Sequence, residues 1–217
     1  MDEDIKKSIL KSSTSLVGIV CKDGVVMGAD RRGTAGSIVL EKNAQKITQI
    51  NDHILVSNTG SVSDMQLSNK VLSAELRLKE LKTKSKVNVK EAAHLLALLT
   101  YRNIRNPSML PSIVGTLIGG VDEDGKTYLF SIEPAGSVKE VEDYDANFSS
   151  GMPYIMGFLE RMYKKDLTVK EAVELAKESL KSSTQRDVGS GNGIDVFTIT
   201  KDGVKHVVSE EIVAEYK

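Results

Sequence analysis

Short apolar runs come in pairs along this chain, and a few turn-forming residues separate the two runs of each pair. The first pair, residues 15–21 and 25–30, is joined by Lys22-Asp23-Gly24, which suits a tight hairpin turn. The same pattern returns at residues 47–50 and 54–57, 113–121 and 127–132, and 194–200 and 204–208. Because a short turn joins antiparallel strands, the chain is predicted to build mostly antiparallel sheet.

Between these strand groups the apolar residues recur with the period of a helix. Asn88 with Glu91, and Thr168 with Glu171, have the types and spacing of capping boxes at helix starts. Residues 153–163 predict a further helix. The helical stripes are Leu67, Val71, Ala74 and Leu78; Ala92, Leu95, Leu96 and Leu99; and Val169, Ala172, Val173, Ala176 and Leu180. The order of strands, two helices, strands, two helices and strands predicts an α+β fold.

Size and composition place the chain among ordinary folded proteins. It has 217 residues, of which 40% are apolar and 27% charged, and this suffices for one large domain with a packed core. No linker rich in Pro, Gly or Ser and no repeat of fixed period divides it. We therefore expect one domain, with only the first dozen residues detachable.

Charge and hydropathy exclude some partners. Lys and Arg total 29 against 30 Asp and Glu, and Trp is absent, so we expect no nucleic acid partner. Since no run of about 18 apolar residues occurs, no membrane span is expected. The acidic start lacks a secretory signal. The single Cys21 lies in an apolar run that favours a buried thiol, so a cytoplasmic location is expected.

Familiar cofactor and metal motifs fit this sequence poorly. The glycine-rich residues 189–193 precede a predicted strand, whereas a phosphate-binding loop follows a strand and opens a helix. His53, His94 and His206 stand far apart, with no Cys or carboxylate at metal-ligand spacing. We therefore expect neither a cofactor nor a metal.

Thr14 has an unusual place in the chain. It follows a short polar segment and directly precedes the first predicted strand. Cleavage of the bond between Ser13 and Thr14 would make this threonine the first residue of a folded domain. A threonine at a strand edge is ordinary by itself, so the interpretation depends on what else the sequence contains.

A series of motifs accompanies Thr14 in one order. They are Thr14-Ser-Leu-Val-Gly-Ile-Val, Lys22-Asp-Gly-Val-Val, Ala29-Asp-Arg-Arg, Lys42-Asn-Ala-Gln-Lys46, Thr59-Gly-Ser-Val, Ser149-Ser-Gly-Met-Pro153, Gln185-Arg-Asp187 and Gly189-Ser-Gly-Asn-Gly-Ile-Asp195. From Thr14 to about Val208 the chain resembles a 20S proteasome beta subunit, closest to the archaeal type. The resemblance implies an N-terminal nucleophile (Ntn) hydrolase fold, a four-layer αββα sandwich of two antiparallel sheets between helices. It also implies that residues 1–13 form a propeptide removed on maturation and that residues 14–217 form the peptidase domain.

The resemblance also assigns site residues one by one. Thr14 corresponds to the catalytic nucleophile, Asp30 and Lys46 to its acidic and basic neighbours, and Gly60 to the oxyanion donor. The supporting network around the threonine amine corresponds to Ser150, Asp187 and Ser190. The substrate-binding residues of the S1 pocket correspond to Gly33, Ala44, Thr48, Asn58 and Val62.

The chemistry explains these residue types. A threonine hydroxyl needs an adjacent base, and the free amine of the same residue can serve, through a water molecule. An unperturbed α-amine titrates at about 7.7 to 8.0, so a modest downward shift leaves it largely neutral at working pH. Lys46 would favour the neutral amine by like-charge repulsion, while Asp30 would hold the lysine charged and oriented. The implied reaction is endoproteolysis.

Three features depart from the family pattern. The family usually has Gly before the threonine. The side chain of Ser13 makes the strained backbone conformation that self-cleavage needs harder to adopt. Met152 alters the surroundings of Ser150. Asn58 is polar where a small apolar residue is frequent, which leaves the cleavage preference open.

The implied partners are those of a proteasome. Heptameric beta rings would stack between rings of alpha subunits, an ATPase unfoldase would act on the particle, and unfolded polypeptides would be the substrates. Two alternatives stay open from the sequence. One is an unprocessed, non-catalytic structural subunit of the ring, and the other is a bacterial-type, HslV-like ATP-dependent peptidase.

Overall fold

The computed structural model describes residues 13–108 and 112–212. The expected propeptide, residues 1–13, therefore lies outside the described residues except for Ser13. The helices are α2 (Val62–Thr83), α3 (Val89–Arg105), α4 (Met152–Met162) and α5 (Val169–Thr184). The strands are β1 (Leu16–Cys21), β2 (Gly24–Asp30), β3 (Gly33–Ala35), β4 (Ile38–Glu41), β5 (Ile47–Gln49), β6 (Ile54–Gly60), β7 (Val114–Val121), β8 (Thr127–Ile132), β9 (Val138–Glu140), β10 (Tyr144–Asp145), β11 (Gly193–Thr200) and β12 (Gly203–Glu211).

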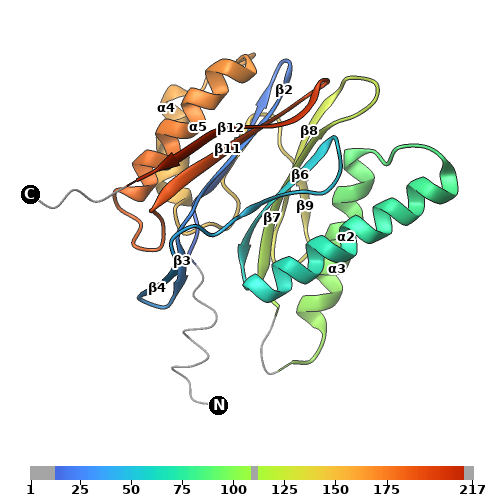
Figure 1. The fold of residues 1–217 in the computed structure, drawn as a ribbon, viewed down its shortest axis with the longest axis horizontal. Coiled ribbons are helices and arrows are strands. Elements are labelled where there is room, and N and C mark those ends of the chain that lie inside the picture. The colour runs from blue at the N-terminus through green and yellow to red at the C-terminus, as the bar shows by residue number, and fades with distance from the viewer. Residues whose placement is uncertain (1–12, 109–111, 213–217) are drawn as a thin grey trace, which may run out of the picture.

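The described strands form two five-stranded sheets and a separate β3–β4 hairpin. The first sheet has the order β10-β1-β2-β11-β12, and the second has the order β5-β6-β7-β8-β9. Every pairing in them is antiparallel, as the hairpin turns of the sequence predict. Figure 1 shows α4 and α5 against the first sheet and α2 and α3 against the second. The predicted α+β sandwich of two antiparallel sheets between helices is confirmed.

Three apolar clusters fill the three spaces between these layers. Along β1 and β2, Val17 and Val26 face α4 and α5, while Leu16 and Met27 face the second sheet. Along β6 the neighbours of Leu55 point instead toward α2 and α3. Because successive strand residues point to opposite faces, a strand buried on both faces is apolar throughout. This explains the continuous apolar runs in the sequence.

Helix starts follow the predicted capping. Asn88 and Thr168 both form capping boxes, in which the side chain accepts from the backbone of Glu91 or Glu171 and the glutamate accepts in return. Each box satisfies two of the N–H groups that a helix start leaves unpaired. None of the described helices combines the length and the apolar character needed to cross a membrane.

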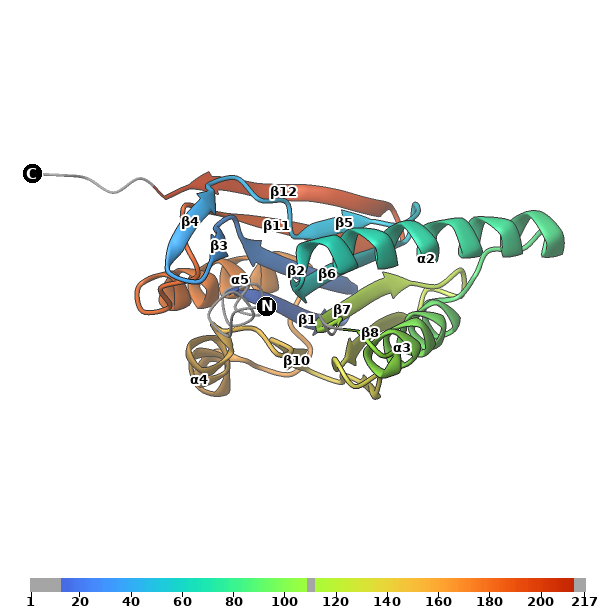
Figure 2. The same cartoon turned by 90° about the horizontal axis from the view of Figure 1, so that it is seen from below.

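Helix α2 differs from its sequence pattern in one respect. Leu72 and Leu76 are buried against the second sheet, whereas Leu67 and Leu78 of the predicted stripe are 59% and 45% exposed. The stripe continues to Leu81, which is 61% exposed. The helix therefore carries two apolar faces, and only one of them packs inside this chain. The long helix lies along the outside of the molecule in Figure 2.

Candidate active site

The β1–β2 hairpin brings the start of the first strand beside the end of the second. Leu16 pairs with Ala29, and the next residues outward are Ser15 and Asp30. The backbone N–H of Asp30 donates to the carbonyl oxygen of Ser15 at 3.0 Å. Strand β11 pairs on the other side of β2, with Ile194 opposite Asp30. Residues from the two ends of the chain thus meet at one end of the first sheet.

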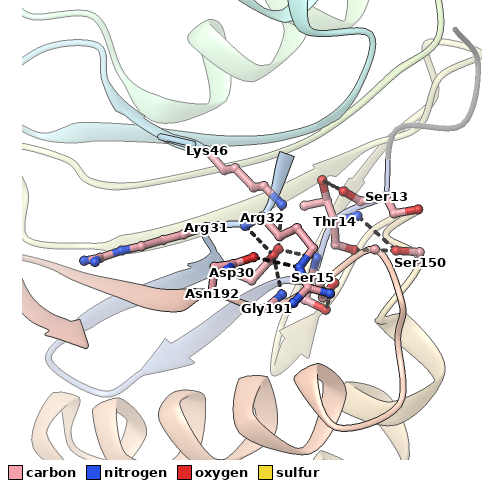
Figure 3. Close-up of polar contacts among 12 residues, drawn as sticks. Ser13, Thr14, Ser15, Asp30, Arg31, Arg32, Lys46, Ser150, Gly191 and Asn192 are labelled. Atoms are coloured by element: carbon pink, nitrogen blue, oxygen red, sulfur yellow. Dashed lines mark hydrogen bonds and ion pairs between the residues drawn. The ribbon is translucent and has the colours of Figure 1, made fainter. Parts of the chain in front are cut away.

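Asp30 is held there by four donors and is 1% exposed. Its Oδ1 accepts from the backbone N–H of Ser15 at 2.8 Å and from Lys46 Nζ at 2.6 Å. Its Oδ2 accepts from the backbone N–H groups of Arg32 and Gly191, each at 2.9 Å. A buried carboxylate is costly unless it is paired in this way. Figure 3 shows Lys46 reaching this carboxylate while Arg31 points away from it.

Lys46 precedes β5 and extends from the second sheet toward the first. Its side chain is 7% exposed, and burial lowers its pKa because the charged form loses its water. The Asp30 carboxylate opposes this shift without cancelling it. Because its pKa is lowered, this ammonium gives up a proton more readily than a lysine on the surface.

Thr14 is 2% exposed and is engaged through both its hydroxyl and its nitrogen. Its Oγ1 donates to the carbonyl oxygen of Ser13 at 2.8 Å, and its backbone N–H donates to Ser150 Oγ at 2.9 Å. Ser150 Oγ in turn donates to Asp187 Oδ2 at 2.6 Å, and Ser190 Oγ donates to the same oxygen at 2.5 Å. The Thr14 nitrogen therefore faces a carboxylate through one hydroxyl.

A cavity of about 590 Å³ opens beside Thr14 and Lys46. It is lined by Ser13, Thr14, Arg32, Gly33, Thr34, Leu40, Glu41, Ala44, Gln45, Lys46, Thr48, Val62, Met65 and Gln66. The set includes four of the five residues expected in the S1 pocket, Gly33, Ala44, Thr48 and Val62. The structure thus gathers the proposed nucleophile, its lysine and an apolar wall around one space large enough for a peptide side chain.

Asn58 is the fifth expected S1 residue, and it is not among the residues that line this cavity. It is 3% exposed, its Nδ2 donates to Asn69 Oδ1 at 3.1 Å, and its Oδ1 accepts from Thr116 Oγ1 at 2.9 Å. Asn69 continues the chain by donating to Thr48 Oγ1 at 3.2 Å. The polar side chain turns into the interior because partners are available there. Asn58 therefore supports the cavity wall from behind Thr48.

Gly60 ends β6 with a φ of +115°, a region that favours glycine. A Cβ on this residue would lie 2.0 Å from the carbonyl oxygen of Ile113. The position accordingly requires glycine for two reasons, backbone conformation and close approach of β7. Gly60 is not among the cavity-lining residues either, so its role as oxyanion donor stays a prediction.

Comparison with known proteins shows the family of this chain. Residues 10–199 match the family described as proteasome subunit. The chain belongs to the proteasome subunit family. Relatives of this family member include the proteasome subunit beta of Nanoarchaeum equitans, 42% identical over 91% of this chain and 98% of that protein. The proteasome subunit beta of Methanobrevibacter smithii is 40% identical over 92% and 93%. The proteasome subunit beta 1 of Thermococcus onnurineus is 40% identical over 94% and 97%.

The sequence did not predict a role for some residues at the site of this proteasome family member. Ser15 and Ser183 are fully buried beside Ser190, and Gly191 holds Asp30 through its backbone. Ser183 has a signal in the sequence, because it lies on the buried face of α5 together with Ala176, Ser179 and Leu180. Ser15 precedes β1, and its only signal is its place next to Thr14. A backbone donor such as Gly191 has no such signal. Within residues 13–108 and 112–212, no group of three or more His, Cys, Asp or Glu side chains is placed to hold a metal ion.

Proposed function

We propose that this chain is a threonine-type endopeptidase subunit of a proteasome core particle, active once residues 1–13 are removed to expose Thr14. The observation that carries the proposal is the position of the Thr14 hydroxyl. It donates to the Ser13 carbonyl oxygen at 2.8 Å, in a site that also contains the buried pair of Lys46 and Asp30. Family membership supports the same conclusion.

Self-cleavage would use this arrangement. Thr14 Oγ1 attacks the carbonyl carbon of Ser13, the peptide C–N bond breaks, and the hydroxyl proton ends on the departing Thr14 nitrogen. The ester that links Ser13 to Thr14 Oγ1 is then hydrolysed by water. This second step releases residues 1–13 as a peptide with a free carboxylate, and it leaves Thr14 with a free amine.

Substrate hydrolysis would use the same atoms in a second round. The free amine accepts the proton of Thr14 Oγ1, through a water molecule, as the oxygen attacks a substrate carbonyl carbon. Lys46 stabilises negative charge that develops on the threonine oxygen. Ser150 and Asp187 face the same nitrogen and stabilise the ammonium that forms. The first fragment leaves as an amine, and water then cleaves the ester on Thr14.

Assembly into a particle is supported by the second apolar face of α2. Leu67, Leu78 and Leu81 lie along one side of this helix and are 59%, 45% and 61% exposed. Contiguous exposed apolar surface on a folded protein indicates a contact with another chain. We assign this face to contacts within a cytoplasmic particle in which seven-membered beta rings stack between rings of alpha subunits. The enclosed chamber would admit unfolded polypeptides supplied by an ATPase unfoldase.

The test is the N-terminal residue of the assembled protein. The full chain is produced together with an alpha subunit, and intact mass and Edman sequencing are measured on particles that hydrolyse a fluorogenic peptide. We expect Thr-Ser-Leu as the first residues. Thr14→Ala should keep residues 1–13 and lose hydrolysis, while Thr14→Ser should retain both reactions in part. Active particles that still begin Met-Asp-Glu, or an active Thr14→Ala variant, would overturn the proposal. Inactive particles that keep residues 1–13 would instead identify a structural subunit.

A further inference from the structure

Ser15, the residue after the proposed nucleophile, is attached to both halves of the site. Its backbone N–H donates to Asp30 Oδ1, the same oxygen that accepts from Lys46. Its side-chain Oγ donates to Ser190 Oγ at 2.7 Å, and Ser190 donates onward to Asp187. Ser15 therefore connects the lysine side of the site to the side that faces the Thr14 nitrogen.

A second buried serine continues this chain of hydroxyl groups. Ser183, in the last turn of α5, lies within hydrogen-bond distance of Ser15 through the two Oγ atoms. Ser15, Ser183 and Ser190 are all 0% exposed. No bulk water therefore competes for these hydroxyl protons, and their order is set by their partners.

Asp187 fixes the direction in which the hydroxyl groups donate. An ionised carboxylate only accepts, so Ser190 must give it its single proton. Ser190 Oγ then accepts from Ser15, and Ser15 Oγ accepts from Ser183. On the other side of Asp187, Ser150 donates to the same Oδ2 and accepts from the Thr14 nitrogen. A chain of three serine hydroxyl groups and the single hydroxyl of Ser150 thus converge on one carboxylate oxygen.

The backbone is shaped to admit this pair of serines. A Cβ on Gly151 would lie 1.9 Å from Ser15 Oγ and 2.2 Å from Ser183 Oγ. The absence of a side chain at Gly151 makes the space in which the two hydroxyl groups meet. The same glycine donates its backbone N–H to the Thr14 carbonyl oxygen at 3.2 Å, directly beside the proposed nucleophile.

We propose that Ser15 and Ser183 are positioning residues that act through Ser190 on Asp187 and so set the proton affinity of the Thr14 amine. The proposal rests on the function proposed above. By donating to Ser190, Ser15 strengthens the hydrogen bond that Ser190 gives to Asp187 and disperses the negative charge of that carboxylate. Without the Ser15 hydroxyl, Asp187 holds the threonine ammonium more strongly. The amine is then neutral, and able to act as a base, only at higher pH.

Other charged groups lie around the same site, and the test must leave them unchanged. Asp30 at the end of β2 and Lys46 just before β5 form their ion pair beside the site, while Arg32 and Glu41 line the same cavity as Thr14. Ser15→Ala removes only an uncharged hydroxyl and leaves the backbone N–H on Asp30. A shift in the pH profile of this variant therefore reports the hydroxyl chain and not a lost charge.

The experiment measures kcat/KM for a fluorogenic peptide from pH 5 to pH 9, on full-length chains assembled with an alpha subunit. Ser15→Ala is expected to lower the maximum rate about three- to tenfold and to move the acid limb to higher pH. Ser183→Ala should shift the limb in the same direction by less. Ser15→Thr keeps the hydroxyl and should restore the wild-type limb. Ser179→Ala is the matched control, since Ser179 is equally buried on α5 but donates to the Ala176 carbonyl.

The outcomes separate this proposal from the proposed function. If Thr14→Ala stays active, the nucleophile assignment fails and the role of Ser15 fails with it. If Thr14→Ala is inactive but Ser15→Ala and Ser183→Ala keep the wild-type acid limb, only the positioning role is wrong. Should Ser15→Ala not assemble, the pH profile of Ser183→Ala decides alone, because that serine is more remote from Thr14.

Discussion

Lys46 Nζ lies 2.6 Å from Asp30 Oδ1, and the two side chains are 7% and 0% exposed. A salt bridge this deeply buried gains little net stability, because both charges have lost their water. Breaking it by removal of one partner is costly, since the other charge is left alone. Such a pair is better explained by chemistry at Thr14 than by a contribution to folding.

This view predicts that stability and activity separate at the pair. Lys46→Met keeps the length of the side chain and leaves the Asp30 carboxylate without its cation, so the free energy of unfolding should fall by about 3 to 5 kcal/mol. Asp30→Asn combined with Lys46→Met removes both charges and should recover part of that loss. The asparagine oxygen can still accept from the backbone N–H groups of Arg32 and Gly191, but its amide nitrogen then faces the backbone N–H of Ser15. Neither variant should hydrolyse peptides. Urea denaturation gives the stabilities, and a fluorogenic peptide gives the activity. A double variant with wild-type activity would contradict this role of the pair.

A second prediction concerns the glycine at the end of β6. Gly60→Ala would place a Cβ 2.0 Å from the Ile113 carbonyl oxygen at a φ of +115°, so the backbone must move. We expect a loss of about 2 kcal/mol or more in stability and a roughly hundredfold loss of hydrolysis if the Gly60 amide is the oxyanion donor.

The matched control for this variant is Gly125→Ala in the β7–β8 turn. Gly125 also has a positive φ, +81°, but a Cβ there would have no atom within 4 Å. Its cost should be about 1 kcal/mol of backbone strain, with activity unchanged. If Gly60→Ala lowers stability but leaves hydrolysis at the wild-type rate, Gly60 is structural and another group stabilises the oxyanion.

The sequence predicted the sheets and helices because their patterns are local. Hairpin turns such as Lys22-Asp23-Gly24 specify antiparallel neighbours, and the capping boxes at Asn88 and Thr168 mark helix starts. The β3–β4 hairpin was not predicted, because strand β4 is exposed throughout and lacks an alternating pattern. Ile38-Val39-Leu40 is a strand-forming composition, but an apolar run of three residues is too short to predict a strand by itself.

The site was predicted less completely than the fold, for a physical reason. The roles proposed for Asp30 and Lys46 rest on motifs, whereas the direction of the Asn58 side chain depends on Asn69 and Thr116, which lie on other elements. Likewise the link from Ser15 to Ser183 spans 168 positions in the sequence. Contacts between distant segments are set by tertiary packing and have no local pattern. The same limit applied to α2, where Leu67, Leu78 and Leu81 are exposed while the buried face combines Leu72 and Leu76 with the polar Ser68 and Asn69.

That exposed stripe gives a third prediction. Leu78→Glu with Leu81→Glu places two charges on the outer face of α2, away from the buried Leu72 and Leu76. The chain should still fold, with an unchanged far-ultraviolet circular dichroism spectrum, but it should fail to enter the particle. Native mass spectrometry after production with an alpha subunit measures this. The control is Arg77→Glu, a charge change on the same helix beside the stripe, at a side chain that is 70% exposed. Full assembly of the double variant would show that this face makes no subunit contact.

The last prediction uses the single cysteine as an internal probe of the first sheet. Cys21 is 4% exposed, and burial raises the pKa of its thiol from 9.0 to about 12. The folded state therefore keeps the neutral thiol between these two values while the unfolded chain ionises, so stability is lost as pH rises above about 9. The loss should approach about 1.4 kcal/mol per pH unit. Urea denaturation of wild type and Cys21→Ala at pH 8, 9.5 and 10.5 isolates this term, because other groups titrate equally in both proteins. A thiol reagent at pH 8 should label Cys21 only after unfolding. A pH-independent difference between the two proteins, or rapid labelling of the folded chain, would show that the thiol is accessible to water and that the end of β1 opens in solution.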